Sequence, residues 1–101
     1  MESEETIVRV RVCGRVQGVG YRVFTQTEAM ARGITGWVRN RSNGDVEAVF
    51  AGRIEAVDAL CEICRQGPPL AFVEALEISI ADDSALKETG WDGGFLQLAT
   101  F

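Results

Sequence analysis

Residues 35–51, TGWVRNRSNGDVEAVFA, have the pattern of a β-hairpin. Residues 35–41 and 45–51 contain the β-branched and aromatic residues that are enriched in strands. The intervening Ser42-Asn43-Gly44 includes an Asn-Gly pair, which is a strong signal for a tight turn between two strands. The stretch therefore predicts two neighbouring antiparallel strands.

An amphipathic helix is predicted on each side of this hairpin. The first runs from Arg22 to Gly33, where glycine suits the end of a helix. Its expected apolar face consists of Val23, Phe24, Thr27, Met30, Ala31 and Ile34. The second covers residues 53–66 and is stopped by the glycine and two prolines at 67–69. Its apolar side consists of Ile54, Val57, Leu60, Cys61 and Cys64.

Two further strands lie outside the helices. Residues 6–13, TIVRVRVC, alternate between apolar and charged side chains, as a half-buried strand does, and residues 71–80 form a fourth strand. Residues 82–94 are polar and turn-rich, and residues 95–100 form a short last strand. The order βαββαβ predicts an α+β, ferredoxin-like sandwich, with two helices on one face of a mainly antiparallel sheet. We expect one domain over residues 1–101.

The composition excludes several classes of function. No apolar run approaches the ~20 residues that span a bilayer, and the acidic start is unlike a signal peptide. Three cysteines argue against a secreted disulfide framework, and a net charge of −5 argues against general nucleic-acid binding. The absence of histidine removes every mechanism that needs an imidazole. We expect a monomeric cytoplasmic protein that binds neither membranes nor nucleic acid.

A glycine-rich loop, GRVQGVGYR at residues 14–22, joins the first strand to the first helix. Four arginines and no acidic residue occur between Arg9 and Arg22. A loop that enters a helix N-terminus presents unpaired amides and a partial positive charge, which together bind phosphate-like anions. Arg22 could add a bidentate contact. The alternative is a glycine-rich turn that only reverses the chain.

Asn40 is expected to return to this loop. A helix over residues 22–33 advances by about 18 Å at ~1.5 Å per residue. A strand over residues 35–40 comes back by about 20 Å at ~3.3 Å per residue. An amide side chain beside a bound phosphate could orient an attacking water. The alternative role for Asn40 is to start the hairpin turn.

These two segments resemble the two motifs of the acylphosphatase family. Residues 14–22 match the first motif, and residues 36–40 with Gly44, Val46 and Gly52 match the second. The resemblance implies hydrolysis of small acyl phosphates to a carboxylate and inorganic phosphate, without a metal or other cofactor. It implies that Arg22 binds the phosphate and that Asn40 positions the water. It also implies a cradle made by the amides of Val16, Gln17, Gly18, Val19, Gly20 and Tyr21.

Two other functions fit parts of the sequence. A non-catalytic phosphate-binding or anion-binding regulatory module would keep the loop but hydrolyse nothing. An RNA-binding sandwich needs aromatic residues on its central strands for base stacking, whereas residues 8–12 are alternating valine and arginine.

Cys61-x-x-Cys64 lies towards the end of a predicted helix, where a thiolate is not stabilised, so we interpret both cysteines as buried small apolar residues.

Overall fold

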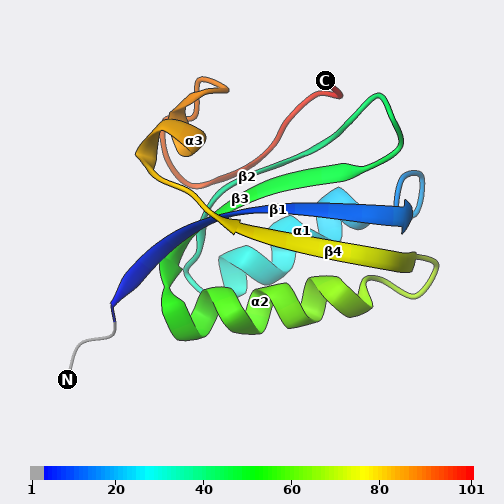
Figure 1. The fold of residues 1–101 in the computed structure, drawn as a ribbon, viewed down its shortest axis with the longest axis horizontal. Coiled ribbons are helices and arrows are strands. Elements are labelled where there is room, and N and C mark those ends of the chain that lie inside the picture. The colour runs from blue at the N-terminus through cyan, green and yellow to red at the C-terminus, as the bar shows by residue number, and fades with distance from the viewer. Residues whose placement is uncertain (1–3) are drawn as a thin grey trace.

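The computed structural model describes residues 4–101 and contains a five-stranded sheet with two helices lying along one face (Figure 1). The elements are β1 (Glu5–Arg15), α1 (Tyr21–Ala31), β2 (Thr35–Asn40), β3 (Val46–Arg53), α2 (Ile54–Gln66), β4 (Phe72–Ile80), α3 (Asp83–Lys87) and β5 (Phe95–Gln97). Part of the acidic start, residues 1–3, lies outside the described residues. Within residues 4–101, no helix has both the length and the apolar character needed to cross a bilayer.

The strand order is β4-β1-β3-β2-β5. β3 lies in the centre, antiparallel to both β1 and β2, so that β1 and β2 run in the same direction. β4 pairs antiparallel with β1, and β5 pairs parallel with β2. This arrangement confirms the predicted α+β, ferredoxin-like fold, although the last strand is shorter than the predicted 95–100.

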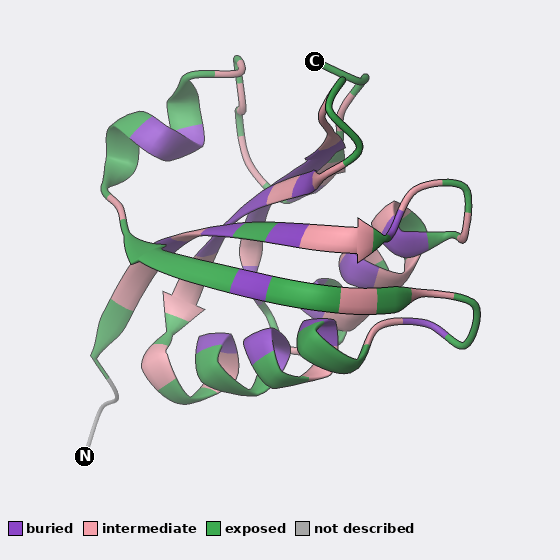
Figure 2. Ribbon diagram, turned by 45° about the vertical axis from the view of Figure 1, so that its right-hand side comes forward, coloured by how far each residue is buried: buried purple, intermediate pink, exposed green. Residues whose placement is uncertain are grey.

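The main core lies between the sheet and the two long helices. Val10 and Val12 of β1, Phe50 of β3 and Leu60 of α2 are all buried there. The buried positions of α2 gather on the side that faces the sheet (Figure 2). The periodicity of the sequence therefore predicted this helix and its buried face correctly.

Cys61 and Cys64 are buried in this core, as the sequence indicated. Burial raises the pKa of the Cys61 thiol to about 11 and that of the Cys64 thiol to about 12. Because the thiolate is the reactive form of cysteine, this burial disfavours reaction of both side chains at neutral pH. They contribute to the structure through packing.

The predicted apolar face of α1 is wrong for most of its residues, although Ile34, which follows the helix, is buried as expected. Val23 and Met30 are 57% and 64% exposed, and the buried positions are Tyr21, Thr25 and Ala29, four residues apart. Thr25 is buried at low cost because its hydroxyl donates a hydrogen bond to the Tyr21 carbonyl at 2.8 Å. Hydrophobicity alone therefore pointed to a face rotated away from the one that packs.

The opposite face of the sheet carries α3, which the sequence analysis did not predict. The Asp82 carboxylate caps this short helix by accepting a hydrogen bond from the Ser84 amide at 3.0 Å. Leu86 packs with the fully buried Trp37 of β2, whose indole N–H donates to the Ala85 carbonyl at 3.1 Å. The polar segment 82–94 thus covers a second, smaller core.

The predicted burial of the aromatic residues outside the helices is confirmed for some of them and wrong for one. The sequence predicts Trp37, Phe50 and Phe72 as core residues and Trp91 as a loop anchor. Trp37 and Phe50 are buried, and the indole of Trp91 donates to the Gly94 carbonyl at 3.0 Å. Phe72 was expected in the core but is 65% exposed. Its neighbour Val73 packs against the main core, so Phe72 points to the opposite face of β4, which is an edge strand of the sheet.

Glu47 of β3 is the centre of a charge cluster on the α3 side of the sheet. Its carboxylate accepts hydrogen bonds from Arg9 at 2.7 Å, Arg39 at 2.8 Å and Arg41 at 3.1 Å. Burial by itself would raise the pKa of Glu47, but the hydrogen bonds from Arg39 and Arg9 outweigh it and hold the pKa below its ordinary value. The cluster therefore stabilises the fold only while Glu47 is ionised.

This lowered pKa gives a pH-dependent stability. The contribution of Glu47 is present above the ordinary carboxyl pKa of 4.5 and is lost as the pH falls through the lower pKa of the folded state. Glu47→Gln is expected to lower the free energy of unfolding at pH 7 by about 1–3 kcal/mol, and to matter less at pH 3. Urea unfolding at both pH values measures this, with Glu62→Gln, from an exposed ion pair, as the control. An equal effect of Glu47→Gln at both pH values would contradict it.

Candidate active site

The register of the sheet brings the end of β1 level with the end of β2. Val46 of β3 is paired with Val12 on one side and with Asn40 on the other. β1 ends at Arg15, only three residues beyond Val12, so the glycine-rich loop starts beside the end of β2. The sheet therefore places Asn40 next to the loop, as the lengths of the intervening elements predicted.

The loop has the backbone form of an anion site. Gly18 and Gly20 have φ values of +74° and +78°, in the left-handed region that favours glycine, and a Cβ at either would meet no atom within 4 Å. Gly20 precedes α1, and the first hydrogen bond of the helix runs from the Phe24 amide to its carbonyl at 3.0 Å. The amides of residues 21–23 are thus left without partners inside the helix, and the first turn, which is fully described, has no acidic residue.

Arg22 lies in this first turn, and its side chain is held by a residue that follows β5. Its Nη1 donates to the carbonyl of Leu98 at 3.1 Å. A guanidinium has five N–H donors, so this contact fixes the group while leaving others for a ligand. The carboxamide of Asn40, in contrast, makes no hydrogen bond with any other group of residues 4–101.

A small pocket of about 120 Å³ joins these groups. Sites for drug-sized ligands have about 300–1,000 Å³, so this one is on the scale of a small anion. Its lining includes both Arg22 and Asn40. The remaining residues are Val16, Gly18, Gly20, Tyr21, Val23 and Gln97. The structure therefore brings together six of the eight residues singled out from the sequence.

The other two, Gln17 and Val19, do not line the pocket. The Gln17 side chain turns to the hairpin, where its Nε2 donates to the carbonyls of Arg41 and Asp45, each at 2.8 Å. Val19 packs against the main core. Gln17 therefore attaches the loop to the β2–β3 hairpin, and Val19 attaches it to the main core.

Gln17→Leu is therefore expected to loosen the loop. Loss of two partly buried hydrogen bonds should lower the free energy of unfolding by about 1–3 kcal/mol and raise the inhibition constant of inorganic phosphate. Urea unfolding and phosphate titration measure the two effects. Gln66→Leu, at the exposed end of α2, is the matched control. Wild-type values for Gln17→Leu in both measurements would show that the side chain does not hold the loop.

Val23 and Gln97 line the pocket but were not singled out as site residues. Val23 follows Arg22 in the first turn of α1, and its place beside the loop could have been inferred. Gln97 arrives through the parallel pairing of β5 with β2, in which it lies opposite Val38. No local motif marks it, because its position depends on where the last strand joins the sheet.

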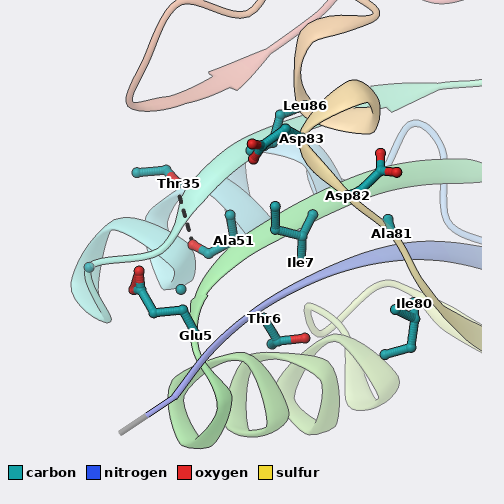
Figure 3. A pocket seen from close by; sticks show the side chains of 12 residues that line it. Glu5, Thr6, Ile7, Thr35, Ala51, Ile80, Ala81, Asp82, Asp83 and Leu86 are labelled. Atoms are coloured by element: carbon teal, nitrogen blue, oxygen red, sulfur yellow. Dashed lines mark hydrogen bonds between the residues drawn. The ribbon is translucent and has the colours of Figure 1, made fainter. Parts of the chain in front are cut away.

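A wider hollow of about 780 Å³ lies at the other end of the strands, near the start of β1. Figure 3 shows the carboxylates of Glu5, Asp82 and Asp83 around it. Three carboxylates disfavour an anion, whereas the small pocket offers amides and an arginine. Chemistry rather than size therefore identifies the small pocket as the candidate active site.

The small pocket has no group that titrates near neutral pH. Burial raises the pKa of the Tyr21 phenol above its ordinary value, and its hydroxyl donates to the Cys64 carbonyl inside the core. Within residues 4–101, no three or more Cys, Asp or Glu side chains gather where they could hold a metal ion. The pocket can bind charge and orient a ligand, but it offers no side chain for proton transfer at neutral pH.

Comparison with known proteins agrees with this geometry. Residues 8–90 match the family model described as acylphosphatase, which includes the loop, Arg22 and Asn40. The chain belongs to the acylphosphatase family. It is a hydrolase that acts on acyl phosphates and releases inorganic phosphate.

Relatives within the acylphosphatase family match most of the chain. It is 47% identical over 81 residues to the acylphosphatase of Rhizobium etli, covering 80% of this chain and 86% of that protein. It is 46% identical over 96 residues to the acylphosphatase of Nitrobacter winogradskyi, covering 95% and 97%. The crystal structure of acylphosphatase from Bacillus subtilis has a TM-score of 0.81 at 34% identity, covering 94% of this chain and 99% of that one.

Proposed function

We propose that the small pocket is the catalytic centre and that it hydrolyses acyl phosphates without a metal. The observation that carries the proposal is the lining of one anion-sized pocket by both Arg22 and Asn40. In this proposal Arg22 and the loop bind the phosphate, and Asn40 positions the water.

In this proposal two sets of hydrogen-bond donors bind the phosphate: backbone amides and the Arg22 guanidinium. The amides of the glycine loop and of the first turn of α1 donate to its oxygens, and the partial positive charge of the helix N-terminus favours its negative charge. Arg22 adds charge-assisted hydrogen bonds in a planar fork that matches two phosphate oxygens. Its contact with the Leu98 carbonyl at 3.1 Å supports this role, because the guanidinium is already oriented before the ligand arrives.

Asn40 orients the nucleophile. Its carboxamide oxygen accepts a hydrogen bond from a water, which directs a lone pair of that water towards phosphorus. The water oxygen bonds to phosphorus while the bond from phosphorus to the acyl oxygen breaks, and that oxygen leaves with the electron pair as a carboxylate. The water proton passes to a phosphate oxygen, so the products are the carboxylate and inorganic phosphate.

The leaving group explains why so few groups suffice. The conjugate acid of a carboxylate has a pKa of about 4.3, so the carboxylate can leave phosphorus at neutral pH without a general acid. Positioning and charge stabilisation then account for most of the catalysis. A phosphate monoester would leave as an alkoxide and would need a proton or a metal, so we propose that monoesters are not substrates.

An assay with benzoyl phosphate in the presence of a chelator tests this function. We expect hydrolysis well above the rate in buffer, and competitive inhibition by inorganic phosphate. Rates equal to those in buffer, with phosphate still bound, would instead favour a non-catalytic anion-binding module. Loss of activity with the chelator, restored by a divalent cation, would contradict the metal-free mechanism.

The remaining features of the proposal come from the sequence. We propose that residues 1–101 act as one monomeric domain in the cytoplasm, with no nucleic-acid partner. The acidic net charge and the odd number of cysteines support this. Gel filtration with light scattering tests the oligomeric state.

A further inference from the structure

Asn40 lies at the end of β2, where the edge of the sheet is completed by residues 98–101. β5 pairs with β2 only as far as Val38. Beyond it, the Phe101 amide donates to the Asn40 carbonyl at 3.0 Å, and the Ser42 amide donates to the Phe101 carbonyl at 2.9 Å. The backbone of Phe101 therefore forms hydrogen bonds with both Asn40 and Ser42, the residues on either side of Arg41.

The ring of Phe101 is seated on the two arginines that flank Asn40. The guanidinium of Arg39 lies 4.4 Å from the ring centroid, and that of Arg41 lies 4.8 Å from it. Arg39 also lies 4.7 Å from the ring of Trp37, so it is enclosed between two aromatic rings. Both arginines are fixed by hydrogen bonds to Glu47. The Phe101 ring thus contacts two guanidinium groups whose positions are already fixed by Glu47.

Asn40 has no such restraint on its own side chain. Successive residues of a strand point to opposite faces, so Arg39 and Arg41 take the α3 side with Phe101, and Asn40 faces the pocket. Its carboxamide has no partner among the described residues, so its direction depends on the backbone that carries it. A small rotation of this strand end would move the amide oxygen away from the water it is meant to orient.

We propose that Phe101 is a positioning residue that fixes Asn40 from the opposite face of the sheet. The inference rests on the proposed role of Asn40. Phe101 does not line the pocket and needs no contact with the substrate. Its ring clamps the two flanking arginines, and its backbone pairs with the strand end, so that the carboxamide of Asn40 keeps one direction.

Kinetics of Phe101→Ala test the proposal. We expect kcat for benzoyl phosphate to fall about three- to tenfold, with the inhibition constant of inorganic phosphate unchanged, because the loop and Arg22 are untouched. Phe101→Trp should retain kcat, and Phe101→Leu, which keeps an apolar side chain without the π face, should not. Phe72→Ala is the matched control, because that ring is 65% exposed, close to the 67% of Phe101, and lies at the other edge of the sheet.

A double-mutant cycle separates positioning from a general loss of stability. In the Asn40→Ala background, Phe101→Ala should change kcat by less than about twofold, because the group it positions is absent. The same fall in both backgrounds, or no fall in either, would overturn the proposal. If Asn40→Ala alone kept the wild-type kcat, the proposed function would fail, whatever the effect of Phe101.

The NMR signals of the Asn40 side-chain amide provide a readout without catalysis. We expect them to be sharp in the wild type and shifted or broadened in Phe101→Ala, while those of Asn43 stay in place. Unchanged Asn40 signals in Phe101→Ala would contradict the proposal even in a protein with no measurable turnover.

Discussion

Arg22→Lys is expected to lower kcat/KM for benzoyl phosphate by about 10²-fold or more. The substitution keeps the positive charge but replaces a planar fork by a single ammonium group. A lysine cannot bind two phosphate oxygens in parallel while also keeping the contact that holds Arg22 to the Leu98 carbonyl. Loss of about two charge-assisted hydrogen bonds, each worth roughly 1.5–3 kcal/mol, accounts for this magnitude. Steady-state kinetics and phosphate inhibition measure it.

Arg15→Lys is the control for this change. Arg15 ends β1 and is the second residue of the same loop, but it is exposed and does not line the pocket. It should therefore tolerate lysine with near wild-type kinetics. Wild-type kcat/KM in Arg22→Lys would show that only a positive charge is needed and would remove the bidentate contact from the mechanism.

Asn40→Ala is expected to lower kcat by about 10²-fold or more while phosphate binding is largely kept. The carboxamide has no hydrogen-bond partner within residues 4–101, so its removal should cost little stability, and its loss affects the orientation of the water rather than the binding of the anion. The measurement is kcat together with the inhibition constant of inorganic phosphate. This separates Asn40 from Arg22, whose replacement should weaken both.

Asn43→Ala is the matched control for Asn40→Ala. Asn43 lies three residues further along, in the hairpin turn, and among the described residues its side chain bonds only to Asp45. Its loss should leave kcat near the wild-type value. A kcat in Asn40→Ala within a factor of about two of the wild type would contradict the water-positioning role.

Much of the site could be predicted because its parts follow from local chemistry and the lengths of two elements. The glycines at 18 and 20 mark a loop that needs positive φ angles, and the loop leads directly into a helix. The helix and strand between Arg22 and Asn40 nearly cancel in length, which brings Asn40 back to the same edge. The paired register of Val46 with both Val12 and Asn40 is the structural basis of that return.

The features that escaped prediction depend on contacts between distant segments. Gln97 reaches the pocket, and Leu98 reaches Arg22, only because β5 adds to β2 in parallel. The helix α3 is short and polar at its start, and its Leu86 is buried only because Trp37 presents an apolar surface on that face. Val23 was assigned to the core by its hydrophobicity, but it follows Arg22 at the mouth of the pocket. None of these positions is set by its own neighbours in the sequence.

The proposed mechanism requires the loop, Arg22 and Asn40 to surround one phosphate group at the same time, with the loop and Arg22 binding it and Asn40 beside it. Titration of ¹⁵N-labelled protein with inorganic phosphate, followed by the backbone amides and the Asn40 side-chain amide, tests it most directly. We expect saturable shifts with one common dissociation constant at residues 16–22 and at Asn40. Shifts that gather instead around Glu5, Thr35 and Asp82, or that leave Asn40 unmoved while the loop saturates, would contradict it.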